Sequence, residues 1–507
     1  MHQSTYPSFL VLVTALFLIS LAFGRGQAQS IEWTRQLGTS VDERSFGVSA
    51  DGLGNVYISG YTAGSLGGPF AGGITDAFVS KCDATGTLLW SRQLGTSSLY
   101  DISYAVSADG LGNVYISGRT DGNLGGTNAG SSDAFVSKYD AAGTLQWTQQ
   151  FGTNNADESY GVSADGLGSV YISGFTGPHS GALDVFVRKY GAAGTLQWSR
   201  QFGTSADEGG SGVSADGLGN VYITGSTRGS LGGANAGSYD AFISKYDAAG
   251  TLQWTRQLGT SADDYSSGVS ADGLGNVYIT GSTAGSLSGT NAGGDDAFIS
   301  KYDAVGTLQW TRQLGTTDRD VSFGVSADGL GNAYISGLTR GSLGGPNAGG
   351  SDAFVSKYDA AGTLQWSQQL GTSTSDWSEG VSADGLGSVY ISGTTQGSLG
   401  GPTAGLEDAF VAKYSDSLPG DYNTSGFADA ADYVVWRDNV GSSVSLPNDS
   451  TAGVGQDDYD RWRNHFGQTA GSGSRTSANA AVPEQATWLL LLAAVPMMWS
   501  CRRATAS

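Results

Sequence analysis

Short runs of β-branched and aromatic residues recur along most of this 507-residue chain, separated by turns rich in Gly, Asp and Asn. In the second copy of the pattern the runs cover residues 104–108, 113–118, 134–139 and 144–151. Runs of this kind suit strands that are buried between packed sheets. Asp-Gly and other Gly-containing turns supply the positive φ angles that tight hairpins need. The pattern therefore predicts units of four short strands.

Three separate markers each count seven of these units. The first is a Trp followed by two polar residues, Gln, Leu or Phe, Gly and Thr, and its copies lie 51 to 57 residues apart. It occurs at Trp33, Trp90, Trp147, Trp198, Trp254, Trp310 and Trp366. The others are Ser-Ala-Asp-Gly-Leu-Gly and an Asp before an Ala-Phe or Val-Phe strand, and each also occurs seven times. Four-stranded units repeated seven times predict a β-propeller.

The two ends of the repeat region predict how the ring closes. The last unit supplies three strands that end near Tyr414, and an extra strand at 31–33 precedes the first unit. Pairing these segments would leave no free sheet edge. The motifs resemble the SBBP β-propeller repeat family over residues 31–415. We therefore expect an all-β, seven-bladed β-propeller closed by an N-terminal strand, with a small α-helical module and a C-terminal hydrophobic helix after it.

The composition of the chain limits the classes of molecule that it is expected to bind. The formal net charge is −21, a sign that repels phosphate backbones, so nucleic acid is not expected as a partner. The two cysteines are Cys82, at a position where the other repeats have Tyr, and Cys501 in a hydrophobic tail. This pair does not predict a disulfide framework, so export has to be argued from the termini.

Both termini carry targeting patterns. An apolar run at 9–23 followed by Gly26-Gln27-Ala28 predicts a secretory signal peptide over residues 1–28. After a flexible linker at 468–481, residues 482–507 read Val-Pro-Glu-Gln, an apolar stretch and Arg502-Arg503. This tail resembles the PEP-CTERM sorting signal. The resemblance implies a membrane helix before processing, an exosortase-type sorting enzyme as partner, and a location in the cell envelope or outside the cell; a plain membrane anchor is the alternative.

Residues 420–467 form a separate segment with a calcium-loop pattern. Oxygen ligands at EF-hand positions 1, 3, 5, 7, 9 and 12 would come from Asp421, Asn423, Ser425, Phe427 (through its carbonyl), Asp429 and Asp432. The element recurs 26 residues later, but its second loop places Pro447 at position 1. The duplicated loop and helix resemble a dockerin module and imply one Ca²⁺ site with a degenerate second loop. An Asp/Asn-rich turn without metal is the alternative.

The crossovers between units carry acidic and aromatic residues. All length changes between repeats fall on this face of the predicted propeller, and variation on one face of a repeat scaffold is typical of binding surfaces. The candidates for a binding face are Asp157, Glu158, Asp207, Glu208, Asp263, Asp264, Tyr265 and Trp377. Such a ring could hold cations, a basic partner or sugar rings. A solvated loop rim is the alternative.

Catalytic motifs do not stand out. The only histidines are His2, His179 and His465, and no nucleophile elbow, zinc motif or phosphate loop occurs in a convincing context. The sequence thus favours a non-enzymatic binding or scaffolding module for glycan or an envelope protein. A secreted carbohydrate-active enzyme and a purely structural envelope component are the alternatives. A buried acid pair with a raised pKa at the axis would favour the enzyme.

Overall fold

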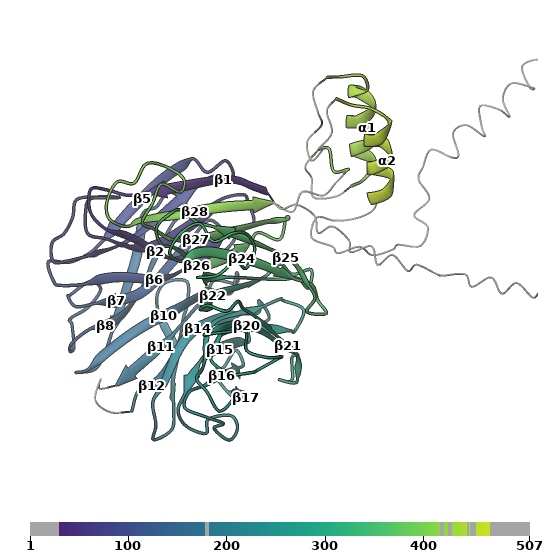
Figure 1. Ribbon diagram of the computed structural model, residues 1–507. Coiled ribbons are helices and arrows are strands. Elements are labelled where there is room, and N and C mark those ends of the chain that lie inside the picture. The colour runs from purple at the N-terminus through teal and green to yellow at the C-terminus, as the bar shows by residue number, and fades with distance from the viewer. Residues whose placement is uncertain are drawn as a thin grey trace, which may run out of the picture.

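The computed structural model describes residues 30–177, 182–415, 420–423, 428–443, 446 and 453–466. Within these residues the chain forms seven four-stranded antiparallel sheets arranged around one axis, and two short helices (Figure 1). The predicted all-β, seven-bladed propeller is confirmed. The predicted signal peptide (1–28), linker (468–481) and sorting tail (482–507) lie outside the described residues.

In the first six blades the four strands run in chain order from the axis outward, and in the seventh the outer strand is β1. The inner strands are β2 (Glu43–Ala50), β6 (Asp101–Ala108), β10 (Ala156–Ala164), β14 (Glu208–Ala215), β18 (Asp264–Ala271), β22 (Asp320–Ala327) and β26 (Asp376–Ala383). The second strands are β3 (Val56–Thr62), β7 (Val114–Thr120), β11 (Val170–Gly177), β15 (Val221–Thr227), β19 (Val277–Thr283), β23 (Ala333–Thr339) and β27 (Ser388–Thr395). The third strands are β4 (Asp76–Cys82), β8 (Asp133–Tyr139), β12 (Asp184–Tyr190), β16 (Asp240–Tyr246), β20 (Asp296–Tyr302), β24 (Asp352–Tyr358) and β28 (Asp408–Ser415). The outer strands are β5 (Leu88–Leu94), β9 (Leu145–Phe151), β13 (Leu196–Phe202), β17 (Leu252–Leu258), β21 (Leu308–Leu314), β25 (Leu364–Leu370) and β1 (Ser30–Leu37).

The outer strand of the seventh blade comes from the other end of the repeat region. β1 pairs antiparallel with β28, with Leu37 opposite Ala409 and Ile31 opposite Tyr414. The seventh sheet therefore has the order β1-β28-β27-β26, whereas every other sheet is continuous in sequence.

A ring of hydrogen bonds joins the inner strands. In each blade an Ala N–H donates to the Ser Oγ of the preceding blade at 3.0 Å. One of these bonds, from Ala50 to Ser382, joins the first blade to the seventh. The small residues of the repeated Val-Ser-Ala segment allow the inner strands to approach closely enough for this bond.

The hydrophobic core lies in layers between blades. Between the fourth and fifth blades, Tyr222 and Ile243 pack against Val277, Ile279 and Phe298, all with less than 1% of their surface exposed. The same positions form the layers between the other blades, so each blade buries both of its faces. Cys82 fills the Tyr position in one layer, and burial raises the pKa of its thiol to about 12. Cys82 therefore serves as a buried side chain of the core.

The two helices after the propeller are α1 (Ala430–Asn439) and α2 (Gln456–His465). Asp429 caps α1 through a hydrogen bond from Ala431 N, and Trp462 of α2 is buried and donates to the Asp429 carbonyl. Among the described residues, no helix combines the length and apolar character needed to cross a membrane.

Candidate functional site

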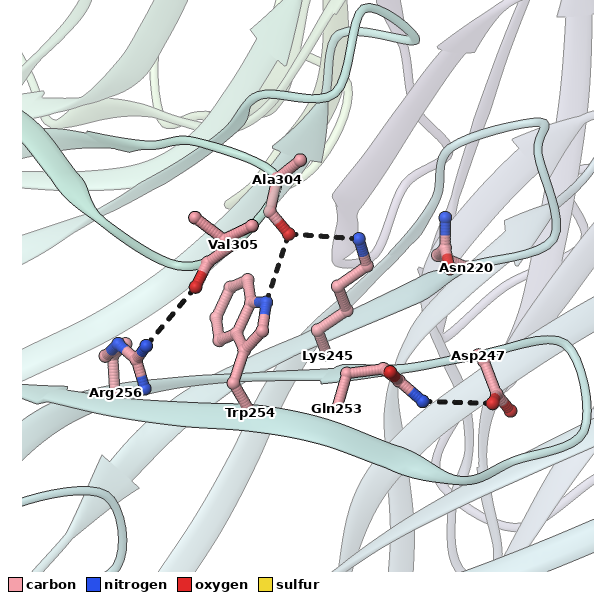
Figure 2. Close-up of a pocket in the computed structure, with 8 residues that line it drawn as sticks. All are labelled: Asn220, Lys245, Asp247, Gln253, Trp254, Arg256, Ala304 and Val305. Atoms are coloured by element: carbon pink, nitrogen blue, oxygen red, sulfur yellow. Dashed lines mark hydrogen bonds between the residues drawn. The ribbon is translucent and has the colours of Figure 1, made fainter.

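The outer strand of the fourth blade interlocks with the fifth blade (Figure 2). Trp254 of β17 donates from Nε1 to the carbonyl of Ala304 at 3.2 Å, in the turn between β20 and β21. Arg256 donates from Nε to the carbonyl of Gly306 at 2.8 Å in the same turn. Gly306 has a φ of +80°, which favours glycine, and a Cβ at this position would lie only 2.8 Å from the Trp254 ring. Any other residue would therefore strain the turn and clash with the indole. Equivalent Trp bonds join five further pairs of neighbouring blades.

The interlock leaves an open cavity of about 570 Å³ beside Trp254. The polar groups that line this cavity form hydrogen bonds with one another: Lys245 Nζ donates to the Ala304 carbonyl, and Gln253 donates to Asp247 (Figure 2). Lys245 also lies 5.3 Å above the ring of Tyr222. Because these groups bond to one another and recur from blade to blade, the cavity is a by-product of the interlock.

The turns on this side of the propeller, which we call the turn face, carry a ring of exposed leucines. Each is the Leu of Asp-Gly-Leu-Gly between the first and second strands, and it exposes 57–73% of its surface. The seven are Leu53, Leu111, Leu167, Leu218, Leu274, Leu330 and Leu386. The turns themselves are held by the repeated Asp, whose Oδ1 accepts two backbone N–H bonds, as Asp272 does from Leu274 and Asn276. The turn face is thus almost the same in every blade.

On the opposite side, called here the crossover face, the first acidic residue of each inner strand is a buried clamp. Asp264 accepts hydrogen bonds from Thr260 N and Thr260 Oγ1, at the end of the preceding blade, and from Thr283 Oγ1 at 2.5 Å. The seven clamps are Glu43, Asp101, Asp157, Glu208, Asp264, Asp320 and Asp376, and none exposes more than 2% of its surface. Burial raises the pKa of five of them, Glu43, Asp101, Asp264, Asp320 and Asp376, against the opposing effect of the threonine bonds.

The predicted binding-face residues therefore separate into two groups. Asp157, Glu208 and Asp264 are clamps in the interior. Glu158 is also buried, where it accepts from Arg119 Nη1 at 2.7 Å and from the Tyr160 hydroxyl at 2.8 Å.

The other four candidates keep part of their surface exposed: Asp207, Asp263, Tyr265 and Trp377. Tyr265 exposes 38% of its surface and lies 5.0 Å from the ring of Tyr239. Arg44 lies 5.4 Å above the ring of Trp377. Asp207 and Asp263 are partly exposed because they precede the strands whose first residues are the buried clamps. Asp157 and Glu158 both lie within β10, and both are buried.

Every inner strand contains a β-bulge at the same place. In β18, for example, Ser266 pairs with Gly281 and Gly268 pairs with Thr280, so Ser267 is an extra residue without a partner. We call the seven extra residues the bulge ring: Phe46, Tyr104, Tyr160, Ser211, Ser267, Phe323 and Glu379. All seven are partly exposed, and a residue in the middle of an inner strand meets solvent on the axis side. The residues directly before and after them are nearly constant. A second variable position of the inner strand lies two residues before the bulge, where the seven repeats carry Arg44, Ile102, Glu158, Gly209, Tyr265, Val321 and Trp377.

The ring has an aromatic side and a hydroxyl side. Tyr104 lies 5.4 Å from Phe46 and stacks on Tyr160 at 4.6 Å between ring centroids. Ser211 and Ser267 follow in the next two blades, where the small side chains leave more room. The seven-fold scaffold therefore presents an asymmetric surface at its axis.

Glu379 is the acidic member of the bulge ring, and the sequence reasoning did not single it out. Its Oε2 is buried and accepts no hydrogen bond from the described residues. Burial raises the pKa of Glu379 to about 8, while the nearby Arg44 and a hydrogen bond from Trp377 act in the opposite direction. Arg44 is itself paired with Glu407, at 2.5 and 3.0 Å. Aligning the repeats on Ser-x-Gly-Val-Ser-Ala would have revealed this residue, because x is Glu only in the seventh copy.

The calcium-loop residues lie partly within the described region. Asp421 and Asp432 are buried, and Asp432 accepts from Asn423 N at 2.9 Å and from Asp429 N at 2.7 Å. Burial, followed by the charges of Asp421 and Asp429, raises the pKa of Asp432. Ser425 and Phe427 lie outside the described residues, and no group of three or more acidic, His or Cys side chains is gathered for a metal in the described part of the chain.

The fold defines a seven-bladed β-propeller built from one repeated unit. Seven segments match the SBBP family, a β-propeller repeat, at residues 32–67, 89–125, 146–177, 197–232, 253–287, 309–344 and 365–400. The chain is an SBBP-repeat propeller. Each matched segment begins in the outer strand of one blade and reaches at least the end of the second strand of the next blade, so one repeat in the sequence includes parts of two neighbouring blades.

Two curated relatives are similar over part of their length. The regulatory protein FlaEY of Caulobacter vibrioides is 27% identical over 354 residues, which cover 59% of this chain and 36% of that protein. An uncharacterised WD repeat-containing protein of Acanthamoeba polyphaga mimivirus is 27% identical over 185 residues, 31% of this chain and 13% of that protein. The match thus covers little more than a third of the length of FlaEY and a smaller share of the mimivirus protein.

Solved structures give weaker similarities. The β-propeller domain of the trilobed protease from Pyrococcus furiosus is 10% identical, with a TM-score of 0.38, over 76% of this chain and 94% of that domain. A gluconolactonase from Xanthomonas campestris is 12% identical, with a TM-score of 0.35, over 75% of this chain and 89% of that chain.

Proposed function

We propose that this protein is an exported, surface-associated propeller that binds a glycan or an envelope protein without catalysing a reaction. The observation that carries the proposal is the contrast between a turn face and core layers that are almost the same in every blade and the bulge ring, which differs from blade to blade and remains partly exposed. A rigid scaffold that varies at one exposed region is typical of a binding module. The terminal sequence patterns support export.

A polysaccharide and envelope-protein panel tests this function. The purified full-length chain is passed over immobilised polysaccharides and envelope extracts, and both retention and released reducing sugar are measured. Retention without release is expected. Release of sugar would overturn the proposal in favour of a carbohydrate-active enzyme, and the absence of both signals would favour a structural envelope component.

The enzyme remains the second candidate because of Glu379. A carboxyl group with a pKa near 8 is protonated at neutral pH and could act as a general acid. Glycoside hydrolysis requires a second carboxylate, and the nearby Glu407 is paired with Arg44. This arrangement favours binding over hydrolysis. Loss of sugar release in Glu379→Gln would identify the enzyme.

We also propose one Ca²⁺ site in the loop from Asp421 to Asp432. The buried Asp421 and Asp432 support it, because the repulsion among Asp421, Asp429 and Asp432 would be relieved by a divalent cation. Calcium titration followed by calorimetry tests the site, with Asp421→Asn as the variant and Asp438→Asn, an exposed acid on α1, as the control. Equal heats for Asp421→Asn and the parent would contradict it.

A further inference from the structure

The bulge ring contains one acidic group, Glu379, whose surroundings offset its charge only in part. Glu379 lies on β26, and the inner strands packed on either side, β22 and β2, place Phe323 and Phe46 at the neighbouring ring positions. Phenyl rings donate no hydrogen bonds, and Glu379 Oε2 accepts none. The adjacent Arg44 is engaged by Glu407 and by the Trp377 ring. An ionised Glu379 is therefore under-compensated.

We propose that the bulge ring binds an alkylammonium group, with Glu379 as its counter-ion and the rings of Phe46 and Phe323 on either side. This inference rests on the binding function proposed above and gives the chemistry of its ligand. Cations are attracted to the faces of aromatic rings, and the attraction grows when the site excludes water. The chain's net charge of −21 further concentrates cations near the protein.

The geometry favours an ammonium over a guanidinium group. A guanidinium binds a carboxylate best through a fork that uses both oxygens, whereas an ammonium acts as a compact point charge. One oxygen of Glu379 is sealed from solvent, although the side chain as a whole remains partly exposed. The methylene groups of an alkylammonium would contact Phe46 and Phe323. Both a partner's lysine side chain and a free alkylamine present this chemistry.

Binding of a cation has a measurable proton signature. Burial holds the pKa of Glu379 at about 8, so most of the population is protonated at neutral pH. The charged groups that face it are Arg44 on β2 and Glu407 before β28. A bound ammonium favours the carboxylate form and lowers this pKa, so binding at pH 7 releases a proton. A neutral sugar at the same place would release none.

The test is calorimetry on the full-length chain at pH 7 in two buffers with different ionisation enthalpies. The probes are n-butylammonium, a short peptide with one lysine, and n-butanol as the neutral isostere. Binding of n-butylammonium or the lysine peptide with proton release is expected, and n-butanol should not bind. Binding of the peptide alone would assign the ammonium to a partner's lysine, and binding of both would show that the free amine suffices.

Variants separate the local ion pair from the overall charge. Glu379→Gln should weaken ammonium binding by about tenfold or more because the counter-ion is lost, and Phe323→Leu should weaken it about threefold. Asp318→Asn, an exposed acid on the crossover face, should change it less than twofold. Equal losses in Glu379→Gln and Asp318→Asn, or no binding by either cationic probe, would overturn the proposal. Retention on the polysaccharide or envelope panel would then still stand, so the two failures are distinguishable.

Discussion

The turn face and the bulge ring are built from the same seven repeats but follow opposite rules. On the turn face every blade repeats the Asp-held turn and the exposed leucine, and the Trp interlock joins six pairs of neighbouring blades among the described residues. In the bulge ring the same seven backbone positions carry Phe, Tyr, Ser or Glu. The side chains that hold neighbouring blades together are the same in each repeat. At a binding surface the backbone fixes the position of each residue, but the side chain can differ from blade to blade. Mutations in the two regions should therefore separate stability from binding.

The interlock should show the largest stability effect. Trp254→Ala removes a large side chain, its hydrogen bond to Ala304 and its contact with the Tyr222 ring. We expect the free energy of unfolding to fall by about 3 kcal/mol. Guanidinium denaturation measures it. Ammonium and glycan binding should be unchanged in the folded variant, and a selective loss of binding would contradict the division between the two regions.

Glu379 should make stability depend on pH. Its pKa is raised from 4.5 to about 8 by folding, so the unfolded chain releases this proton at lower pH than the folded protein does. The contribution is fully present below pH 4.5 and is lost as pH rises to about 8. Glu379→Gln should match the parent at pH 4 and become progressively more stable than the parent as the pH rises to 8.

Thermal unfolding between pH 4 and 9 measures this difference. The clamp acids titrate in both proteins, so they cancel in the comparison. Asp318→Asn should keep the parent's profile. If the stability of Glu379→Gln and of the parent changed in parallel with pH, folding would not raise the pKa of Glu379.

A clamp should have an intermediate effect. Thr283→Val removes one of three donors to the buried Asp264 while keeping the shape of the side chain. The loss should be about 1.5 kcal/mol, because the carboxylate keeps its bonds from Thr260. Urea denaturation measures it, and Ser267→Ala in the neighbouring bulge position is the control. A larger loss in Ser267→Ala would reverse the assigned roles.

The exposed leucines should have the smallest effect on unfolding. Leu274 exposes 66% of its surface, so Leu274→Ser should change the free energy of unfolding by less than about 0.5 kcal/mol. The turn itself is held by Asp272, which the substitution leaves in place. Chemical denaturation beside Asp272→Ala, which should cost more, checks this. A large effect of Leu274→Ser would mean that the turn-face leucines are part of the scaffold.

The repeat markers predicted the blades well because they encode local structure. Asp-Gly-Leu-Gly fixes a turn wherever it occurs, and the run around Tyr222 reads as a buried strand from its composition alone. Counting the markers gave seven blades. The interlock was not predicted, although its Trp was the first marker, because its partner in the next blade lies about 50 residues away.

The candidate site was predicted less well. Glu208 and Asp207 look equivalent in the sequence, but Glu208 is a buried clamp and Asp207 is partly exposed. Glu208 is the first residue of β14 and Asp207 precedes it, so the difference depends on where the strand begins, and sequence patterns locate the ends of elements poorly. The calcium-loop residues and the terminal signals remain predictions that the described residues do not test.

The sequence by itself determined the unit, its copy number and its turns, because these depend on residues close together in the chain. Only the tertiary structure decided which acids are buried and which residues meet at the axis. Glu379 illustrates the difference. Its neighbours Phe323 and Phe46 come from the preceding blade and from the first blade, so its environment exists only when all seven blades surround one axis. Burial and the low dielectric around a charge arise from that assembly.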